Sequence, residues 1–311
     1  MNKDIIFLNP VCTHNIWGGT RLNREFGYPI EGDDIGECWG ISAHPSGDGT
    51  VASGAYKGMK LSELWEKHPE LFGDTGMDRF PLLVKIIDAK DDLSIQVHPD
   101  DAYAKVHENG SLGKTECWFI LDCKENATLV VGHNAKTKEE LEQMIHEGRW
   151  KEFIREIPIK PGDFIQIDPG TVHAIKGGTL LLETQQSSDI TYRVYDYDRL
   201  SNGKPRQLHI AQSIDVITVP AKSADNSVVH TEKKDDAIQQ LIQCPYYTVY
   251  RIDVEHRVET WQDKPFVLMS VVEGEGTLNG TPLKKGDHLI LPDGYGKVEL
   301  QGRMQIIAST I

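Results

Sequence analysis

The strongest constraint on this chain is a series of short apolar segments that glycine and proline residues separate. They include PLLVKII (81–87), ECWFILD (116–122), ATLVVGH (127–133) and TLLLETQQ (179–186). Short segments of this kind, repeated along a chain with turn residues between them, indicate the strands of a sandwich or a barrel. The sequence therefore predicts a mainly β fold.

Helical patterns interrupt the strands at three places. One helix is predicted over LSELWEKHPELFG, which ends near Gly73. A second is predicted over residues 137–157, because Thr137 is a favourable N-cap and Glu140 follows three residues later, as in a capping box. A third is predicted over residues 206–217. We expect these helices to be insertions in the β fold.

The 311 residues suit one large domain or two. Residues 221–237 are polar and weakly patterned, so they indicate a boundary between domains at 1–235 and 236–311. An internal similarity supports this division. PGDFIQIDPGTVHAI (161–175) and KGDHLILPDGYGKVEL (285–300) share a Gly-Asp pair, a short strand and a Pro/Gly turn. They look like equivalent parts of two similar β-barrels.

Charge and cysteine content restrict the partners. The formal net charge is −14, which argues against broad nucleic-acid binding, because phosphates need a basic surface. The sequence contains no apolar run long enough to cross a bilayer and no signal-peptide pattern, so we predict a cytoplasmic protein. The five cysteines include no C-x-x-C pair and are expected to be reduced, buried thiols.

The segment SIQVHPDD (94–101) suggests a site. Gln96 and His98 are two residues apart, so on a strand both side chains leave the same face. Glu116 begins another predicted strand, and His173 follows the turn DPGT. Two imidazoles and a carboxylate form a three-ligand metal set with open positions. This set suits zinc and non-haem iron(II) equally, and Gln96 could be a fourth ligand. We assign ordinary surface or core roles to the other ten histidines.

Several motifs carry a family resemblance. PGDFIQIDPGTVHAI resembles the second motif of the cupin superfamily, although one extra residue lies between Gly162 and the proline. IGECWGISAHPSG, SIQVHPDD, GKTECWFIL and ETQQSSDITYRVYDYDR, in this order along the chain, resemble the short bacterial form of type I mannose-6-phosphate isomerases. The resemblance covers residues 5–311. It implies two cupin-like jelly-roll barrels, the first metal-binding and the second degenerate.

The resemblance also implies roles for individual residues. His98, Glu116, His173 and Gln96 would bind one Zn²⁺ ion per chain. The residues implied in catalysis on a hexose 6-phosphate are Arg193, Lys114, Lys85, Glu183 and Glu37. Residues that grip the phosphate cannot all be placed, because the helical insertion of longer family members is much reduced here. The second barrel has Lys297 where the first has His173, and an ammonium has no acceptor for a metal.

Alternative roles remain for several of these residues. Arg193 could form a structural ion pair with Asp189, Asp196 or Asp198, and either lysine could lie at the surface. The sequence does not choose the proton carrier among Lys85, Lys114, Glu37 and Glu183. Trp17 and Trp39 could wall a sugar pocket or lie in the core.

Two other functions also remain open. One is a cupin dioxygenase that uses iron(II), and the other is a non-catalytic cupin that binds a sugar phosphate. Arg193 and the lysines favour an anionic sugar phosphate over a neutral oxidisable substrate. The intact metal set speaks against a pure binding module.

Overall fold

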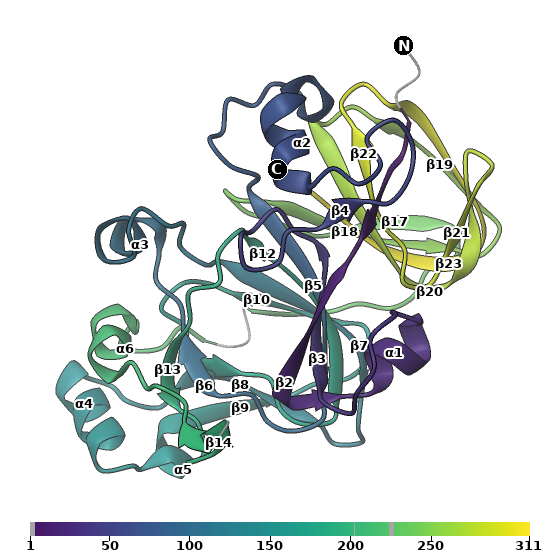
Figure 1. Ribbon diagram of the computed structural model, residues 1–311. Coiled ribbons are helices and arrows are strands. Elements are labelled where there is room, and N and C mark those ends of the chain that lie inside the picture. The colour runs from purple at the N-terminus through teal and green to yellow at the C-terminus, as the bar shows by residue number, and fades with distance from the viewer. Residues whose placement is uncertain (1–3, 202, 224–226) are drawn as a thin grey trace.

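The computed structural model describes residues 4–201, 203–223 and 227–311, and most of its regular structure is β-strand (Figure 1). Its helices are α1 (Arg21–Phe26), α2 (Leu61–Lys67), the 3-10 helix η1 (Pro69–Phe72), α3 (Asp101–His107), α4 (Lys138–His146), α5 (Trp150–Phe153) and α6 (Ile210–Val216). Within the described ranges, no helix has the length and apolar character needed to span a membrane. The prediction of a mainly β fold with helical insertions is confirmed.

The strands form three large sheets and one small one. The seven-stranded sheet contains, in spatial order, β16 (Val228–His230), β10 (Asp163–Ile167), β7 (Glu116–Cys123), β12 (Thr179–Gln186), β5 (Leu82–Ala89), β2 (Val11–Gly19) and β3 (Ile35–Ile41). The five-stranded sheet contains β13 (Tyr192–Tyr195), β6 (Ile95–Val97), β11 (His173–Ala174), β8 (Thr128–His133) and β9 (Ile154–Pro158). The small sheet pairs β14 (Leu200–Ser201) with β15 (Lys204–Pro205).

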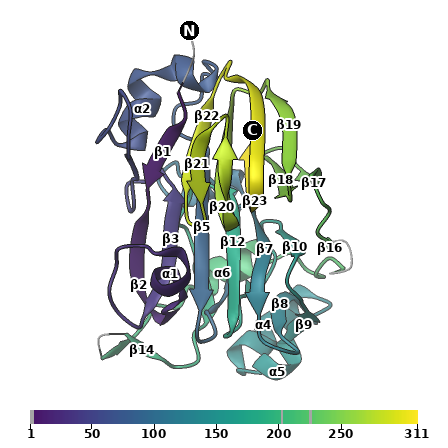
Figure 2. The same cartoon turned by 90° about the vertical axis from the view of Figure 1, so that its right-hand side faces the viewer.

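The nine-stranded sheet holds the C-terminal strands. Its main path is β17 (Ala237–Gln243), β18 (Thr248–Val254), β23 (Gly296–Thr310), β20 (Phe266–Leu278), β22 (His288–Pro292), β1 (Ile6–Asn9) and β4 (Thr50–Val51), with β19 (Arg257–Gln262) and β21 (Thr281–Lys284) paired beside it. The N-terminal strand β1 thus completes a sheet that is otherwise mostly C-terminal. Figure 2 shows β19–β23 at the end of the molecule away from α4 and α5. The division into two barrels and the boundary at residue 236 stay predictions.

The seven-stranded sheet is the middle layer. Its strands β5 and β12 are buried along their whole length, because both faces of the sheet are covered. Alternate residues of β5 point to different cores. Val84 and Ile86 join a cluster with Leu268 and Ile290 of the nine-stranded sheet. Ile87 instead joins a cluster that includes residues of the five-stranded sheet. Lys85 shares this second face, so it points between the two sheets.

The outer face of the five-stranded sheet is covered by helices. Figure 1 shows α4, α5 and α6 grouped beside β6, β8, β9 and β13. Leu141, Met144 and Ile145 of α4 and Phe153 of α5 are buried in the same cluster as Ile95 of β6. The alternation along β6 therefore leaves Gln96 on the opposite, inner face of the sheet.

One predicted helix is partly wrong. Thr137 does cap α4, since its hydroxyl accepts a hydrogen bond from the Glu140 amide at 3.2 Å. The helix ends at His146, however, α5 follows, and residues 154–158 form β9. The segment ends as a strand because it pairs with β8 at the edge of the five-stranded sheet. The third predicted helix is shorter than expected, at Ile210–Val216.

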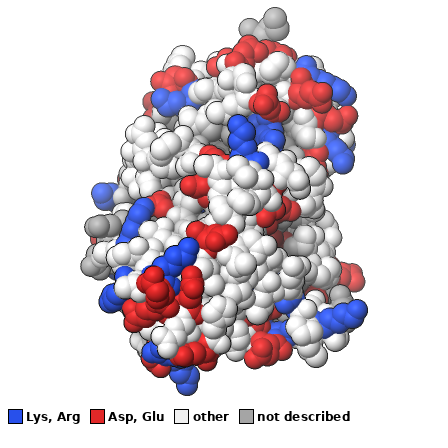
Figure 3. All heavy atoms as spheres, turned by 90° about the vertical axis from the view of Figure 1, so that its left-hand side faces the viewer, with Lys and Arg blue, Asp and Glu red and all other residues white. Residues whose placement is uncertain are grey.

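Two further expectations concern the boundary segment and the cysteines. Residues 221–237 contain β16, which pairs with β10, and residues 224–226 of this segment lie outside the described ranges. All five cysteines are free thiols, as predicted, but only Cys38 and Cys117 are buried, and Cys12, Cys123 and Cys244 are partly exposed. Figure 3 shows acidic and basic side chains interspersed on one face of the molecule, with no broad basic area there.

Candidate active site

The five-stranded sheet presents a row of polar residues on its inner face. Gln96 of β6 is paired in register with His173 of β11 on one side and with Arg193 of β13 on the other. Directly paired residues leave the same face of a sheet. His98 follows directly after β6, so it continues the Gln96 face. Pairing of strands distant in sequence thus brings the two predicted histidine ligands together.

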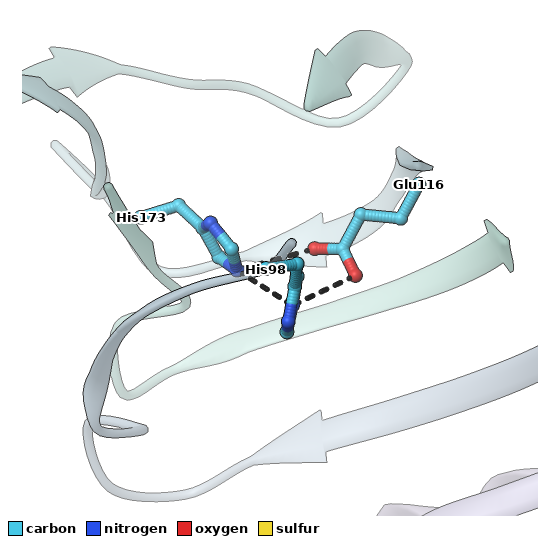
Figure 4. A group of neighbouring side chains, drawn as sticks. All are labelled: His98, Glu116 and His173. Atoms are coloured by element: carbon cyan, nitrogen blue, oxygen red, sulfur yellow. Dashed lines mark hydrogen bonds and ion pairs between the residues drawn. The ribbon is translucent and has the colours of Figure 1, made fainter. Parts of the chain in front are cut away.

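The seven-stranded sheet supplies the carboxylate from the opposite side. Glu116 is the first residue of β7, and its Oε1 and Oε2 atoms lie 3.4 Å from His173 Nε2 and 3.3 Å from His98 Nε2, respectively. The two Nε2 atoms are 3.1 Å apart. Figure 4 shows the three side chains converging on one point. All three residues are buried, and they are the only such group of potential metal ligands within the described residues.

The separations fit a small tetrahedral cation. Nitrogen and oxygen ligands about 2.0–2.1 Å from one Zn²⁺ ion lie roughly 3.3 Å from one another at tetrahedral angles. The separation of the two Nε2 atoms, and the separation of each Nε2 atom from the nearer Glu116 oxygen, are close to that value. Both Glu116 oxygens are buried and have no hydrogen-bond partner of good geometry. A buried carboxylate is costly unless cations compensate it, and the one ion pair of Glu116 with a lysine among the described residues, that of Lys114, reaches Oε2 alone. The residues present therefore fit a metal ion.

Both histidines are neutral in this environment, which is the protonation state that binds a metal. Burial, together with the charge of Lys114, lowers the pKa of His98 to about 3, and burial lowers the pKa of His173 as well. The Nδ1 atom of His173 lies 2.8 Å from the carbonyl oxygen of Thr171. A proton on Nδ1 would donate to this carbonyl and leave the Nε2 lone pair for a ligand bond. His98 Nδ1 is buried and has no such partner.

Gln96 lies beside the histidines. Its amide nitrogen is 3.2 Å from His173 Nε2, and its amide oxygen accepts a hydrogen bond from Ser94 at 3.3 Å. Exchange of the amide oxygen and nitrogen would turn the oxygen toward His173, and the Ser94 hydroxyl can serve either orientation. The position of Gln96 is thus compatible with a fourth ligand.

Lys114 neutralises the carboxylate from the other side. Its Nζ atom lies 2.8 Å from Glu116 Oε2 and 3.2 Å from His98 Nε2. Burial opposes the charged form, but Glu116 and Glu183 outweigh it and raise the pKa of Lys114 to about 12. Although burial opposes ionisation of Glu116 too, Lys114 and the two histidines hold its pKa well below the usual range. Lys114 is therefore a buried cation and not a surface residue.

Four of the predicted catalytic residues form a chain of alternating charges, in the order Glu37, Lys85, Glu183 and Lys114. Lys85 Nζ lies 3.7 Å from Glu37 Oε2 and 3.6 Å from Glu183 Oε1, and Lys114 Nζ lies 3.9 Å from the same Glu183 atom. Lys85 is buried as well, so the surface alternative is wrong for both lysines. Burial and the neighbouring Glu116 raise the pKa of Glu183. The structure thus brings together Glu37, Lys85, Glu183 and Lys114.

Arg193 has no counter-ion among the described residues. Asp196 pairs with Arg199 and Arg206, and Asp189 pairs with His44. The Nε atom of Arg193 is buried and has no hydrogen-bond partner. The geometry therefore gives no support to a structural ion pair. It leaves a cation beside Gln96 that is available to a ligand.

The sequence did not indicate that Trp39 and Trp118 contact the carboxylates of this network. Trp17, which was expected to line a sugar pocket or to lie in the core, is buried in the core between the sheets. Trp39 is buried too, but its indole N–H donates a hydrogen bond to Glu37 at 2.6 Å. The indole N–H of Trp118 donates to Glu183 at 3.0 Å. Only the spacing of Glu37 and Trp39, two residues apart on one strand, signalled such a contact in advance.

The position equivalent to His173 in the C-terminal repeat has a different environment. Lys297 is exposed and pairs with Glu259 at 2.7 Å. The nearby His288 is buried, and its ring nitrogens contact Tyr28 at 2.7 Å and Ser270 at 2.8 Å. Each contact occupies a nitrogen, so the described residues give His288 an ordinary core role.

Comparisons with known proteins agree with this geometry. Residues 5–119 match the family described as phosphomannose isomerase type I, catalytic domain, and residues 237–311 match the mannose-6-phosphate isomerase cupin domain. The chain is 51% identical to mannose-6-phosphate isomerase ManA of Bacillus subtilis over 99% of both chains. It is 48% identical to mannose-6-phosphate isomerase of Streptococcus mutans, over 98% of this chain and 97% of that protein.

Solved structures give the same result. The crystal structure of mannose 6-phosphate isomerase from Bacillus subtilis matches with a TM-score of 0.92 and 49% identity, over 99% of this chain and 100% of that one. A putative mannosephosphate isomerase from Archaeoglobus fulgidus, 22% identical over 98% of this chain and 97% of that one, shares the fold with a TM-score of 0.78. Given the full-length similarity to the Bacillus and Streptococcus enzymes, the chain belongs to the type I mannose-6-phosphate isomerase family, in agreement with the resemblance in its motifs.

Proposed function

We propose that the protein interconverts mannose 6-phosphate and fructose 6-phosphate, with one Zn²⁺ ion held by His98, Glu116, His173 and Gln96. The convergence of three buried ligand side chains carries this proposal, in a chain 51% identical to a mannose-6-phosphate isomerase. A hexose 6-phosphate is the proposed small-molecule partner, and a cytoplasmic location belongs to the same proposal.

The reaction moves a proton between C2 and C1 of the sugar through an enediol or enediolate. A bound divalent cation would supply Lewis-acid polarisation of the sugar oxygens. Arg193 is positively charged at neutral pH and has no counter-ion among the described residues, so it is suited to stabilise the developing negative charge. Lys114 adds a buried cation beside Glu116 and His98.

The proton carrier is a separate question. The high pKa of Lys114 disfavours it as a neutral base. The raised pKa of Glu183 makes this carboxylate a better proton acceptor than an ordinary glutamate. Glu37 and Lys85 lie in the same charge network and remain alternatives. We therefore propose that a carboxylate of this network carries the proton, with Glu183 as the first candidate.

The test is a coupled assay for fructose 6-phosphate formed from mannose 6-phosphate by the zinc-loaded protein. Unphosphorylated mannose serves as the control substrate, and oxygen uptake is followed in parallel with the iron(II)-loaded protein. We expect turnover of the phosphorylated sugar and no oxygen uptake. Oxygen uptake without isomerisation would support a dioxygenase, and binding of mannose 6-phosphate without turnover would support a non-catalytic sugar-binding protein.

A further inference from the structure

A row of four side chains crosses the inner face of the seven-stranded sheet. Trp39 of β3 is paired in register with Lys85 of β5, Lys85 with Glu183 of β12, and Glu183 with Trp118 of β7. Because directly paired residues share a face, all four point toward the five-stranded sheet. Glu116 lies two residues before Trp118 on β7 and therefore on the same face. The Lys85–Glu183 pair thus lies between two tryptophans, Trp39 on the Lys85 side and Trp118 on the Glu183 side.

Trp118 fixes the orientation of Glu183. Its indole N–H donates to Glu183 Oε2 at 3.0 Å, and the whole residue is buried, so water does not compete for this donor. The other oxygen, Oε1, faces both lysines, at 3.6 Å from Lys85 Nζ and 3.9 Å from Lys114 Nζ. It is buried without a hydrogen-bond partner. Tilting of the carboxylate plane would break the Trp118 hydrogen bond, so the indole holds one oxygen in place and keeps the other directed at the lysines.

Trp39 contacts Glu37 in a different arrangement. Its indole N–H donates to Glu37 Oε2 at 2.6 Å, and the contact of Lys85 with Glu37 uses the same oxygen. Lys85 Nζ also lies 4.7 Å from the centre of the Trp39 ring. One tryptophan thus holds both the carboxylate and the ammonium group, through a hydrogen bond and a cation–π contact.

We infer that Trp39 and Trp118 are positioning residues for the isomerisation, which orient Glu37 and Glu183 through their indole N–H groups. This inference rests on the proposed function for its kinetic part. Its geometric part, the two indole–carboxylate hydrogen bonds, stands independently of turnover.

The kinetic test uses Trp39→Phe and Trp118→Phe, which keep an aromatic ring and remove the N–H donor. We expect kcat to fall roughly tenfold to a hundredfold, the change that corresponds to the loss of one hydrogen bond to a charged group, with KM and bound zinc nearly unchanged. Trp65→Phe is the matched control. Trp65 is buried in another core and donates to a backbone carbonyl at 3.3 Å, so its variant should lose stability and keep its kcat.

Double-mutant cycles separate positioning from general destabilisation. If Trp118 acts through Glu183, Trp118→Phe should lower kcat much less in a Glu183→Gln background than in the wild type. The pair Trp39→Phe and Glu37→Gln gives an independent cycle at a less buried position, should the Trp118 variant fold poorly or the Glu183 variant be too slow. Additive effects in the measurable cycle, or unchanged kcat in both tryptophan variants, would overturn the inference.

Nuclear magnetic resonance supplies the readout that does not depend on activity. The chain has six tryptophans, and the Trp→Phe variants assign the indole N–H signals of Trp39 and Trp118. We expect Glu37→Gln to shift the Trp39 signal and Glu183→Gln to shift the Trp118 signal, each with the Trp65 signal unmoved. Unmoved signals would contradict the geometry. Shifted signals in a protein that does not isomerise mannose 6-phosphate would instead contradict the proposed function and leave the geometry intact.

Discussion

At the scale of single residues, the three converging ligands make the first prediction. His98→Ala, Glu116→Ala and His173→Ala should each lower both bound metal and turnover by at least about a hundredfold, because loss of an outer-sphere partner alone costs 10- to 100-fold. Elemental analysis and the isomerase assay measure the two quantities. Lys297→Ala is the control at the equivalent position of the C-terminal repeat, and it should change neither. Full metal occupancy in one of the three variants would remove that residue from the ligand set.

Arg193 should behave differently from the ligands. Arg193→Ala should keep its metal and its thermal stability, since the described structure gives the side chain no ion pair to lose. Turnover should fall by roughly two orders of magnitude or more, on the scale of a lost oxyanion donor. Arg193→Lys should restore little of it, because an ammonium does not reproduce the planar guanidinium. A variant that unfolds, or that loses its metal, would show that Arg193 has a structural role.

At the scale of elements, His288 of β22 contacts Tyr28 and Ser270 of β20. Its burial makes the stability of the fold depend on pH. Burial lowers the pKa of His288 to about 4, from an ordinary value of about 6.5. Between these values the unfolded chain binds a proton and the folded chain does not, so stability falls as the pH falls from about 6.5 to 4. The loss is of the order of 3 kcal/mol.

Chemical denaturation at pH 7 and pH 4.5 measures this effect. We expect His288→Gln to be less stable than the wild type at pH 7, because it disturbs the contacts with Tyr28 and Ser270, and to lose less stability on acidification. His146→Gln is the control, since His146 is exposed and belongs to no ion pair among the described residues. An identical pH dependence in wild type and His288→Gln would contradict the assignment.

The ligand set could be predicted from the sequence, whereas the tryptophan contacts and strand β9 could not. The two-residue spacing of Gln96 and His98, and the turn before His173, depend only on local geometry, so the ligand set was accessible. The contacts of Trp118 with Glu183 and of Lys85 with Trp39 depend on strand register between distant segments, which a single sequence does not specify. Residues 154–157 were expected to be helical. They form a strand because their pairing with β8 overrides the local pattern.

At the scale of the whole molecule, an aromatic cluster joins the N-terminal part to the C-terminal sheet. Phe266 of β20 is fully buried, and its ring centre lies 5.7 Å from that of Phe72, 5.6 Å from that of Phe80 and 6.0 Å from that of Trp65. Phe266→Ala should lower the free energy of unfolding by about 3–5 kcal/mol. Because the cluster is shared, we expect one cooperative transition to shift as a unit.

Thermal unfolding followed by circular dichroism and by isomerase activity tests this coupling. The two signals should disappear together in the wild type and in Phe266→Ala. The control Trp261→Ala changes an exposed aromatic residue and should alter stability by no more than about 0.5 kcal/mol. Two separate transitions, of which only one shifts, would show that the parts unfold independently.

The most direct test of a metal-dependent isomerase follows one preparation through metal removal. The rate of fructose 6-phosphate formation from mannose 6-phosphate is measured before chelation, after removal of metal verified by elemental analysis, and after return of one equivalent of Zn²⁺ per chain. A site formed by His98, Glu116 and His173 predicts turnover that is lost with the metal and restored with it. Turnover that persists at full rate in the metal-free protein would contradict the account.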